Sequence, residues 1–244
     1  TIVPVNPLYQ KVRHGFLKDI EFNLSVAKEF NHSFVIEFTS SDIRPGKFPG
    51  YPFSLDVFVR YIWSGKKLTI EVGGLNAGDK PLPFWVGWHA YFKPSPNGVD
   101  DLELSLPAQT LIKADSNEIP LPGNAAYVPV DHFPDKDFRK VPFRKINKQA
   151  FDLCYGHLDK DHEGWSTCRL FAPDTGIQIS MFQESGFVVL FTGDTLKYRQ
   201  RNSVAIEPMQ CPTNAFNRED CQAEITLQPG QSTRYIFGMT YQVK

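Results

Sequence analysis

The sequence predicts an all-β protein, built as a large antiparallel β-sandwich. Apolar and polar residues alternate in many short segments, which is the period-2 pattern of strands with one buried face. Nineteen prolines and 17 glycines among 244 residues supply frequent turns between these segments. Long stretches with helical spacing do not occur in the sequence, so short strands joined by turns explain it better than helices do.

The first hundred residues are expected to form an antiparallel meander. Pro4 and Pro7 argue against regular structure up to about residue 19. Ser64-Gly65-Lys66 is a typical hairpin turn between two of the alternating segments. The alternation predicts four strands in this part, at 20–26, 33–39, 55–63 and 68–72.

The rest of the chain changes character twice. Residues 94–148 are proline-rich and polar, with short strands expected at 102–106 and 110–114. Strands then return in the C-terminal third, at 166–171, 177–182, 187–192, 203–207, 223–227 and 233–241. Because no internal repeat, low-complexity tract or linker divides the sequence, we expect one domain over residues 1–244.

Composition and charge exclude several classes of partner. The net charge is −1, from 26 basic and 27 acidic residues, so neither nucleic acid nor an anionic membrane surface is expected as a partner. The four cysteines form no C-x-x-C pair and no zinc spacing, which favours free thiols in a reducing compartment. Without an apolar run of membrane-spanning length or a signal-peptide pattern, the expected location is the cytoplasm.

The stretch 81–92 places one imidazole, that of His89, among five aromatic rings. Aromatic faces cover the C–H side of a pyranose, while a polar tip addresses one of its oxygens. This composition indicates a sugar pocket. The alternative interpretation is a core histidine on a buried aromatic strand.

A second stretch, 204–212, carries Glu207 at the end of an apolar run and immediately before Pro208. Partial burial raises the pKa of a glutamate from about 4.3, which makes it a better base near neutral pH. Because histidine titrates near neutrality, His89 and Glu207 suit a reaction that removes one proton and delivers another. The alternative for Glu207 is an ordinary carboxylate in an ion pair.

Three stretches resemble the aldose 1-epimerase, or galactose mutarotase, family. Residues 87–92 are similar to the family's G-x-H-P-Y-F element, with Ala90 in place of the proline. Phe151-Asp152 is a second similarity, and residues 205–217 carry the E-P-M-x-x-P-x-x-A-F core. His14-Gly15 resembles an earlier His-Gly of the family, so the resemblance spans nearly the whole chain. It implies the family's galactose mutarotase-like supersandwich as the fold.

The resemblance also implies a role for each matched residue. Glu207 would take the proton from the C1 hydroxyl of an aldohexose such as glucose or galactose, and His89 would protonate the ring oxygen O5. His14 would hold the monosaccharide near that oxygen. Asp152 would accept hydrogen bonds from sugar hydroxyls, although a turn-initiating aspartate is the alternative. The chemistry only moves protons, so no metal and no cofactor are expected.

Two points leave other interpretations open. The family carries earlier strands with a sugar-contacting arginine in a G-R-x-x-N-R-type element, and this sequence has no counterpart before His14. Either this sequence omits these N-terminal strands, or the protein differs from the family there. Hexose-6-phosphate 1-epimerases share the fold, and Lys11, Arg13 and Lys93 are candidates for a phosphate contact. A non-catalytic carbohydrate-binding module is the alternative from another class. Either a monomer or a homodimer is expected.

Overall fold

The computed structural model describes residues 14–139 and 143–244. The described residues form two compact units that share strands β4 (Lys67–Asn76) and β17 (Ser232–Val243). The first unit contains the described chain up to Gly65, Ile70–Phe84 and Ile225–Tyr235; the second contains Lys66–Thr69, Trp85–Glu224 and Ile236–Lys244. Two strands belong to both units, and that residues 1–244 form one domain stays a prediction.

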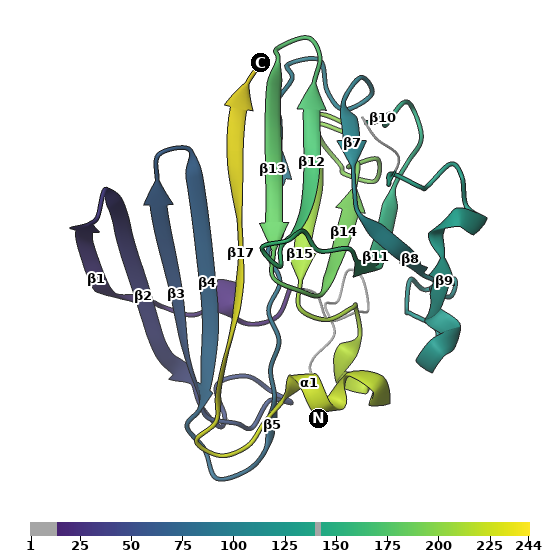
Figure 1. Ribbon diagram of the computed structural model, residues 1–244. Coiled ribbons are helices and arrows are strands. Elements are labelled where there is room, and N and C mark those ends of the chain that lie inside the picture. The colour runs from purple at the N-terminus through teal and green to yellow at the C-terminus, as the bar shows by residue number, and fades with distance from the viewer. Residues whose placement is uncertain (1–13, 140–142) are drawn as a thin grey trace. The chain divides into compact units, whose positions relative to one another are not determined.

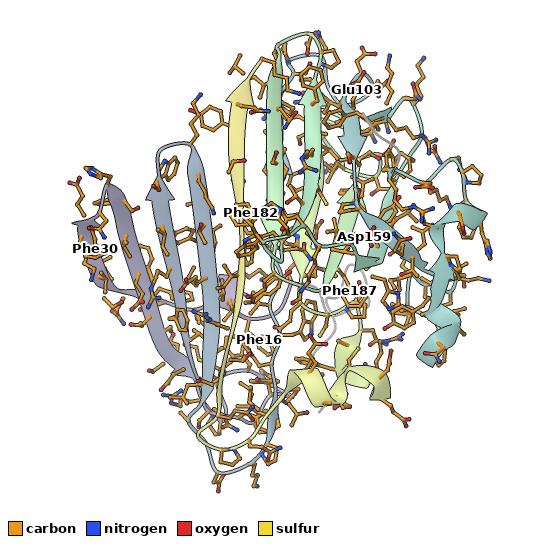
Figure 2. All side chains as sticks on the ribbon, viewed as in Figure 1. Phe16, Phe30, Glu103, Asp159, Phe182 and Phe187 are labelled. Carbon is orange, nitrogen blue, oxygen red and sulfur yellow. The ribbon has the colours of Figure 1, made fainter. Side chains whose placement is uncertain are left out.

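In the first unit, strands follow one another as a hydrogen-bonded meander, in the order β1-β2-β3-β4-β17. Arg60 on β3 pairs with Glu37 on β2 at 2.6 Å and with Glu71 on β4 at 2.7 Å, so one guanidinium ties three strands together. Phe30 projects from the end of β1, where it is 61% exposed (Figure 2). The remaining elements of this unit are η1 (Leu17–Asp19), β1 (Asn23–Phe30), β2 (Ser33–Ile43), β3 (Leu55–Ser64), β5 (Leu82–Pro83) and β16 (Thr226–Leu227).

The second unit is an antiparallel β-sandwich, which confirms the predicted fold class. One sheet has the order β17-β13-β12-β7-β10, and the other has the order β6-β15-β14-β11-β8-β9. In Figure 1, β13 and β12 lie in front of β15 and β14. Its strands are β6 (Tyr91–Phe92), β7 (Glu103–Ser105), β8 (Ala108–Ile112), β9 (Tyr127–Pro129), β10 (Arg144–Lys145), β11 (Asp152–Leu158), β12 (Ser166–Ala172), β13 (Ile177–Gln183), β14 (Phe187–Phe191) and β15 (Val204–Met209).

Between these two sheets lies the core of the second unit. Leu170 on β12 and Met181 on β13 come from one sheet, and Leu190 on β14 and Ile206 on β15 come from the other; each is at most 1% exposed. Because successive strand residues point to opposite faces, burying Leu190 and Ile206 turns the neighbouring odd-numbered residues to the other face of their sheet. That second face carries the candidate site.

Helical structure is confined to short segments. The 3₁₀ segments of the second unit are η2 (Gly123–Ala126), η3 (Val130–His132), η4 (Ala215–Asn217) and η5 (Glu219–Cys221). The one α-helical turn among the described residues is α1 (Gln222–Ile225). No helix in the described ranges is long and apolar enough to cross a membrane.

Two differences from the sequence-based expectation concern α1 and β11. The strand predicted at 223–227 is wrong in its first part, where α1 forms before β16, because Gln222, Ala223 and Glu224 are good helix formers. Strand β11 was not expected, since Gly156 interrupts its apolar pattern. In the structure this glycine makes room for an aromatic ring, because a Cβ there would lie 2.8 Å from Cε1 of Phe187.

Candidate active site

The segment around His89 runs antiparallel along strand β15. Gly87 forms a β-bridge with Met209, and Tyr91 on β6 pairs with Ala205. The same register places His89 directly opposite Glu207. Thus two residues separated by more than a hundred positions meet because of strand pairing.

The two side chains of this pair are in contact. Nε2 of His89 lies 3.3 Å from Oε1 of Glu207, a hydrogen-bonding distance when that nitrogen carries the proton. The His89 side chain is 36% exposed and that of Glu207 only 12% exposed, so the imidazole is the more accessible partner. Tyr91 stacks on the imidazole with ring centroids 5.0 Å apart and planes 22° apart, which supports its orientation.

Glu207 lies on an apolar part of the sheet. Its partner on β14 is Val189, which in turn pairs with Cys154 on β11. Burial raises the pKa of the Glu207 carboxyl to about 8, and the negative charge of Asp152 adds to the rise. Burial, with the charge of Glu207 second, raises the pKa of the Cys154 thiol to about 12, so this thiol stays protonated.

The raised pKa of Glu207 brings its carboxyl into the range where it can take up or release a proton near neutral pH. Nε2 of His89 lies 3.3 Å from Oε1 of Glu207, so a proton on either group can be shared with the other. When that proton is on His89, the pair presents a base and an acid side by side. The geometry therefore suits proton exchange at two neighbouring atoms of one ligand.

Asp152 is on the same face of the sheet, at the start of β11. The register aligns Asp152 with Phe191, Phe191 with Ala205, and Ala205 with Tyr91, so four strands form one row. Three strand spacings of about 4.8 Å separate the backbones at its two ends by about 14 Å. Asp152 is exposed and its charge contributes, after burial, to the raised pKa of the Tyr91 phenol.

Phe191 forms the middle of this row and was not named by the sequence analysis. Its half-buried ring lies 6.4 Å from that of Tyr91 at an interplanar angle of 72°. The alternation in 187–191 could have identified it, because Phe187, Val189 and Phe191 must share a face if Val188 and Leu190 are buried. An aromatic floor between a histidine and an aspartate is suited to the apolar side of a sugar ring.

His14 lies in the first unit, three residues before the start of η1. Its side chain is exposed, and its backbone adopts φ 64°, in the left-handed region. The following residues are anchored by Phe16, whose ring stacks on Phe48 at 4.4 Å and contacts Tyr51 at 5.3 Å. A role of His14 in substrate binding stays a prediction. The site described here thus brings together His89, Glu207 and Asp152 from the second unit.

Comparison with known protein families gives a match over nearly the whole chain. A family model described as Aldose 1-epimerase matches residues 2–240. Among curated proteins, the uncharacterized protein YihR of Escherichia coli K12 is 28% identical over 169 residues, which are 69% of this chain and 50% of YihR. The chain therefore spans about half the length of this relative.

Solved structures with the same fold include three that cover more than nine tenths of this chain. A galactose mutarotase-like protein from Clostridium acetobutylicum aligns with TM-score 0.81 at 14% identity, over 99% of this chain and 72% of its own. A galactose 1-epimerase from Lactobacillus acidophilus aligns with TM-score 0.71 at 18% identity, and the alignment covers 91% of this chain and 66% of the epimerase. An aldose epimerase homologue from C. elegans aligns with TM-score 0.70 at 18% identity, and the alignment covers 91% of this chain and 68% of the homologue. At these identities the likeness shows the fold.

Proposed function

Because the chain belongs to the aldose 1-epimerase family, we propose that it interconverts the α and β anomers of free aldohexoses such as glucose or galactose. The observation that carries this proposal is the 3.3 Å contact between Nε2 of His89 and Oε1 of Glu207, on a sheet face lined by aromatic rings. Cysteine usage also favours a cytoplasmic location, and we expect a monomer or a homodimer.

The reaction opens and recloses a hemiacetal. Glu207 removes the proton of the C1 hydroxyl while His89 donates a proton to O5, so the C1–O5 bond breaks and its electron pair stays on O5. Rotation about C1–C2 exposes the other face of the aldehyde. On reclosure His89 removes the proton from the O5 hydroxyl and Glu207 returns one to the carbonyl oxygen, which gives the opposite anomer.

The position of the two groups fits this chemistry. Both reacting oxygens are bonded to C1, so the acid and the base must lie within a few ångströms of each other, as His89 and Glu207 do. Each well-positioned group of this kind typically contributes about 10²–10⁴ to the rate. Asp152 and His14 would then hold the substrate, Asp152 by accepting hydrogen bonds from hydroxyls at the other end of the row.

Polarimetry on freshly dissolved α-D-glucose and α-D-galactose tests this proposal. We expect the protein to accelerate mutarotation, and expect Glu207→Gln and His89→Asn each to lose at least a hundredfold of the acceleration with unchanged circular dichroism. Glu219→Gln and His132→Asn, at exposed positions, serve as matched controls. A Glu207→Gln variant with near-full activity would contradict the mechanism.

The same assay separates the alternatives. Activity on glucose 6-phosphate but not on glucose would favour a hexose-6-phosphate 1-epimerase. Of the three candidate phosphate contacts, Lys93 is exposed, whereas Lys11 and Arg13 lie outside the described residues. Sugar binding in a calorimeter with no acceleration of mutarotation would favour a non-catalytic carbohydrate-binding module.

A further inference from the structure

A cavity of about 240 Å³ lies in the second unit, apart from the residues assigned to proton transfer. Neither His89 nor Glu207 nor Asp152 lines it. At about 30 Å³ per water molecule, this volume corresponds to about eight waters, which is more than a structural water requires. The cavity is therefore large enough for an organic group.

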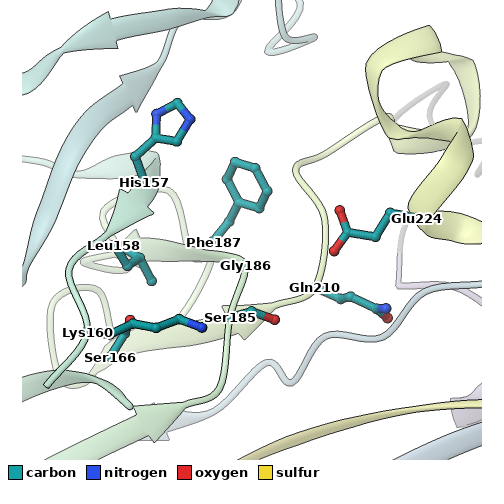
Figure 3. A pocket seen from close by; sticks show the side chains of 9 residues that line it. All are labelled: His157, Leu158, Lys160, Ser166, Ser185, Gly186, Phe187, Gln210 and Glu224. Atoms are coloured by element: carbon teal, nitrogen blue, oxygen red, sulfur yellow. The ribbon is translucent and has the colours of Figure 1, made fainter. Parts of the chain in front are cut away.

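Two opposite charges reach into this cavity from opposite sides. Figure 3 shows Lys160, which follows β11, extending towards the middle, with the carboxylate of Glu224 from α1 across from it. Neither side chain forms an ion pair with any other residue in the described ranges, although Lys145 and Asp101 of the same unit do pair, at 2.6 Å. Burial raises the pKa of Glu224, so its carboxylate gains from a hydrogen-bond donor.

Neutral polar groups add further hydrogen-bonding capacity. Gln210 accepts a hydrogen bond from the backbone N–H of Val86 through Oε1, and its amide NH₂ donates to none of the described residues. Ser166 lines the cavity floor, and its hydroxyl is buried without a partner among the described residues. A buried hydroxyl without a partner gains from a hydrogen bond to a ligand.

Aromatic rings form the remaining wall. Phe187 lines the cavity together with His157, whose Nδ1 lies 3.2 Å from Oγ1 of Thr110 and whose ring lies 5.2 Å from that of Tyr127. His157 adopts φ 49°, a conformation that is uncommon for residues other than glycine. Its ring is thus held at the cavity by two contacts.

The chemistry of this lining selects one kind of ligand. A simple anion is repelled by Glu224, and a simple cation is repelled by Lys160. A neutral group with many hydroxyls suits both residues, since each hydroxyl donates one hydrogen bond and accepts others. The face of Phe187 then covers C–H groups, as aromatic rings do in sugar sites.

The cavity lies along the same sheet as the proposed catalytic pair. Phe187 is two residues from Val189 on β14, and Val189 is the strand partner of Glu207. Two residues of a strand span about 7 Å, and residues two apart share a face. Gln210 follows Glu207 by three positions at the end of β15. Two linked rings can therefore occupy both places at once.

We propose that this cavity is a subsite for a second sugar ring, linked to the aldose that reacts at His89 and Glu207, so that the chain favours reducing disaccharides over free hexoses. This inference rests on the proposed function. Lys160 and Glu224 bind hydroxyls of the second ring, and Phe187 covers its apolar face.

Initial mutarotation rates on glucose, lactose, maltose and melibiose test the proposal, because all three disaccharides have glucose at the reducing end. We expect kcat/KM for at least one disaccharide to exceed that for glucose about tenfold. Lys160→Met, Glu224→Gln and Phe187→Leu should each remove most of this preference by raising KM for the disaccharide. Lys113→Met, at an exposed position in the same unit, is the matched control and should keep it.

Binding to the Glu207→Gln variant keeps the subsite testable separately. If no sugar mutarotates faster with the protein, the proposed function fails, while calorimetry with each of the three disaccharides and with glucose still reports on the cavity. Tighter binding of the disaccharide that Lys160→Met abolishes would support the subsite. Equal kcat/KM values for glucose and all three disaccharides, or a preference unchanged in all three cavity variants, would overturn it.

Discussion

Replacing Glu207 by glutamine should stabilise the protein at alkaline pH while it removes activity. In the folded protein burial raises the pKa of this carboxyl from the ordinary value of 4.5 to about 8, with the charge of Asp152 as a second cause. A raised folded-state pKa means that folding favours the protonated form. The contribution of this group to stability is thus fully present below about pH 4.5 and is lost as the pH rises through 8.

The size of the effect follows from the difference of about 3.5 between the two pKa values. At 1.36 kcal/mol per pKa unit, the loss between pH 4.5 and pH 9 amounts to at most about 5 kcal/mol. Glutamine has nearly the same shape as glutamic acid and carries no charge at any pH. We therefore expect Glu207→Gln to remove this part of the pH dependence.

Urea denaturation at pH 5 and pH 9 measures the difference. The free energy of unfolding should fall by several kcal/mol more in the wild type than in Glu207→Gln over this range. Glu219→Gln, an exposed control, should follow the wild type. Parallel pH dependences for wild type and Glu207→Gln would refute the conclusion that burial in the sheet raises the pKa of this carboxyl.

Three further substitutions test the surroundings of the site. Tyr91→Leu should lower kcat of mutarotation about tenfold with little change in melting temperature, because the ring stacked on His89 at 5.0 Å is lost; an unchanged kcat would contradict an orienting role. Cys211→Ser should remain active at 25 °C but melt earlier, since a fully buried thiol becomes a hydroxyl; loss of the rate would mean that this thiol has a role in the reaction. Gly186→Ala should destabilise the fold by about 2 kcal/mol or more in urea, because φ is 96° and an added Cβ would clash with the carbonyl oxygen of Met209; wild-type stability would contradict this packing.

The strands that alternate cleanly were predictable from the sequence, and their pairing was not. The alternation in 55–63 and 177–182 gave β3 and β13 almost within one residue of their ends. Strand β11 was missed because Gly156 breaks its pattern, and its place becomes clear only once Phe187 packs against that glycine. Such a contact joins residues about thirty positions apart, and local patterns carry no information about it.

For the candidate site, the sequence indicated which residues matter, and the structure shows that His89 and Glu207 lie opposite each other. Residue composition alone suggested an imidazole among aromatic rings and a desolvated carboxylate. That His89 lies opposite Glu207 depends on the register between 87–91 and 205–209, which no local signal sets. The cavity at Lys160 and Glu224 was not predicted for the same reason: its lining comes from segments that only the fold brings together.

Pro208 is one of three residues in or directly after β15 that hold the backbone on either side of His89. The backbone N–H of Trp88 donates to the carbonyl of Pro208 at 3.0 Å, but proline has no N–H to donate in return. One backbone hydrogen bond also forms on each side, from Ile206 to Ala90 at 3.2 Å and from Gln210 to Val86 at 2.9 Å. His89 lies between Trp88 and Ala90, so these bonds on both sides keep the imidazole opposite the carboxylate. The proline after Glu207 therefore contributes to the positioning of His89, through the bond that its carbonyl accepts from Trp88, as well as to the strand.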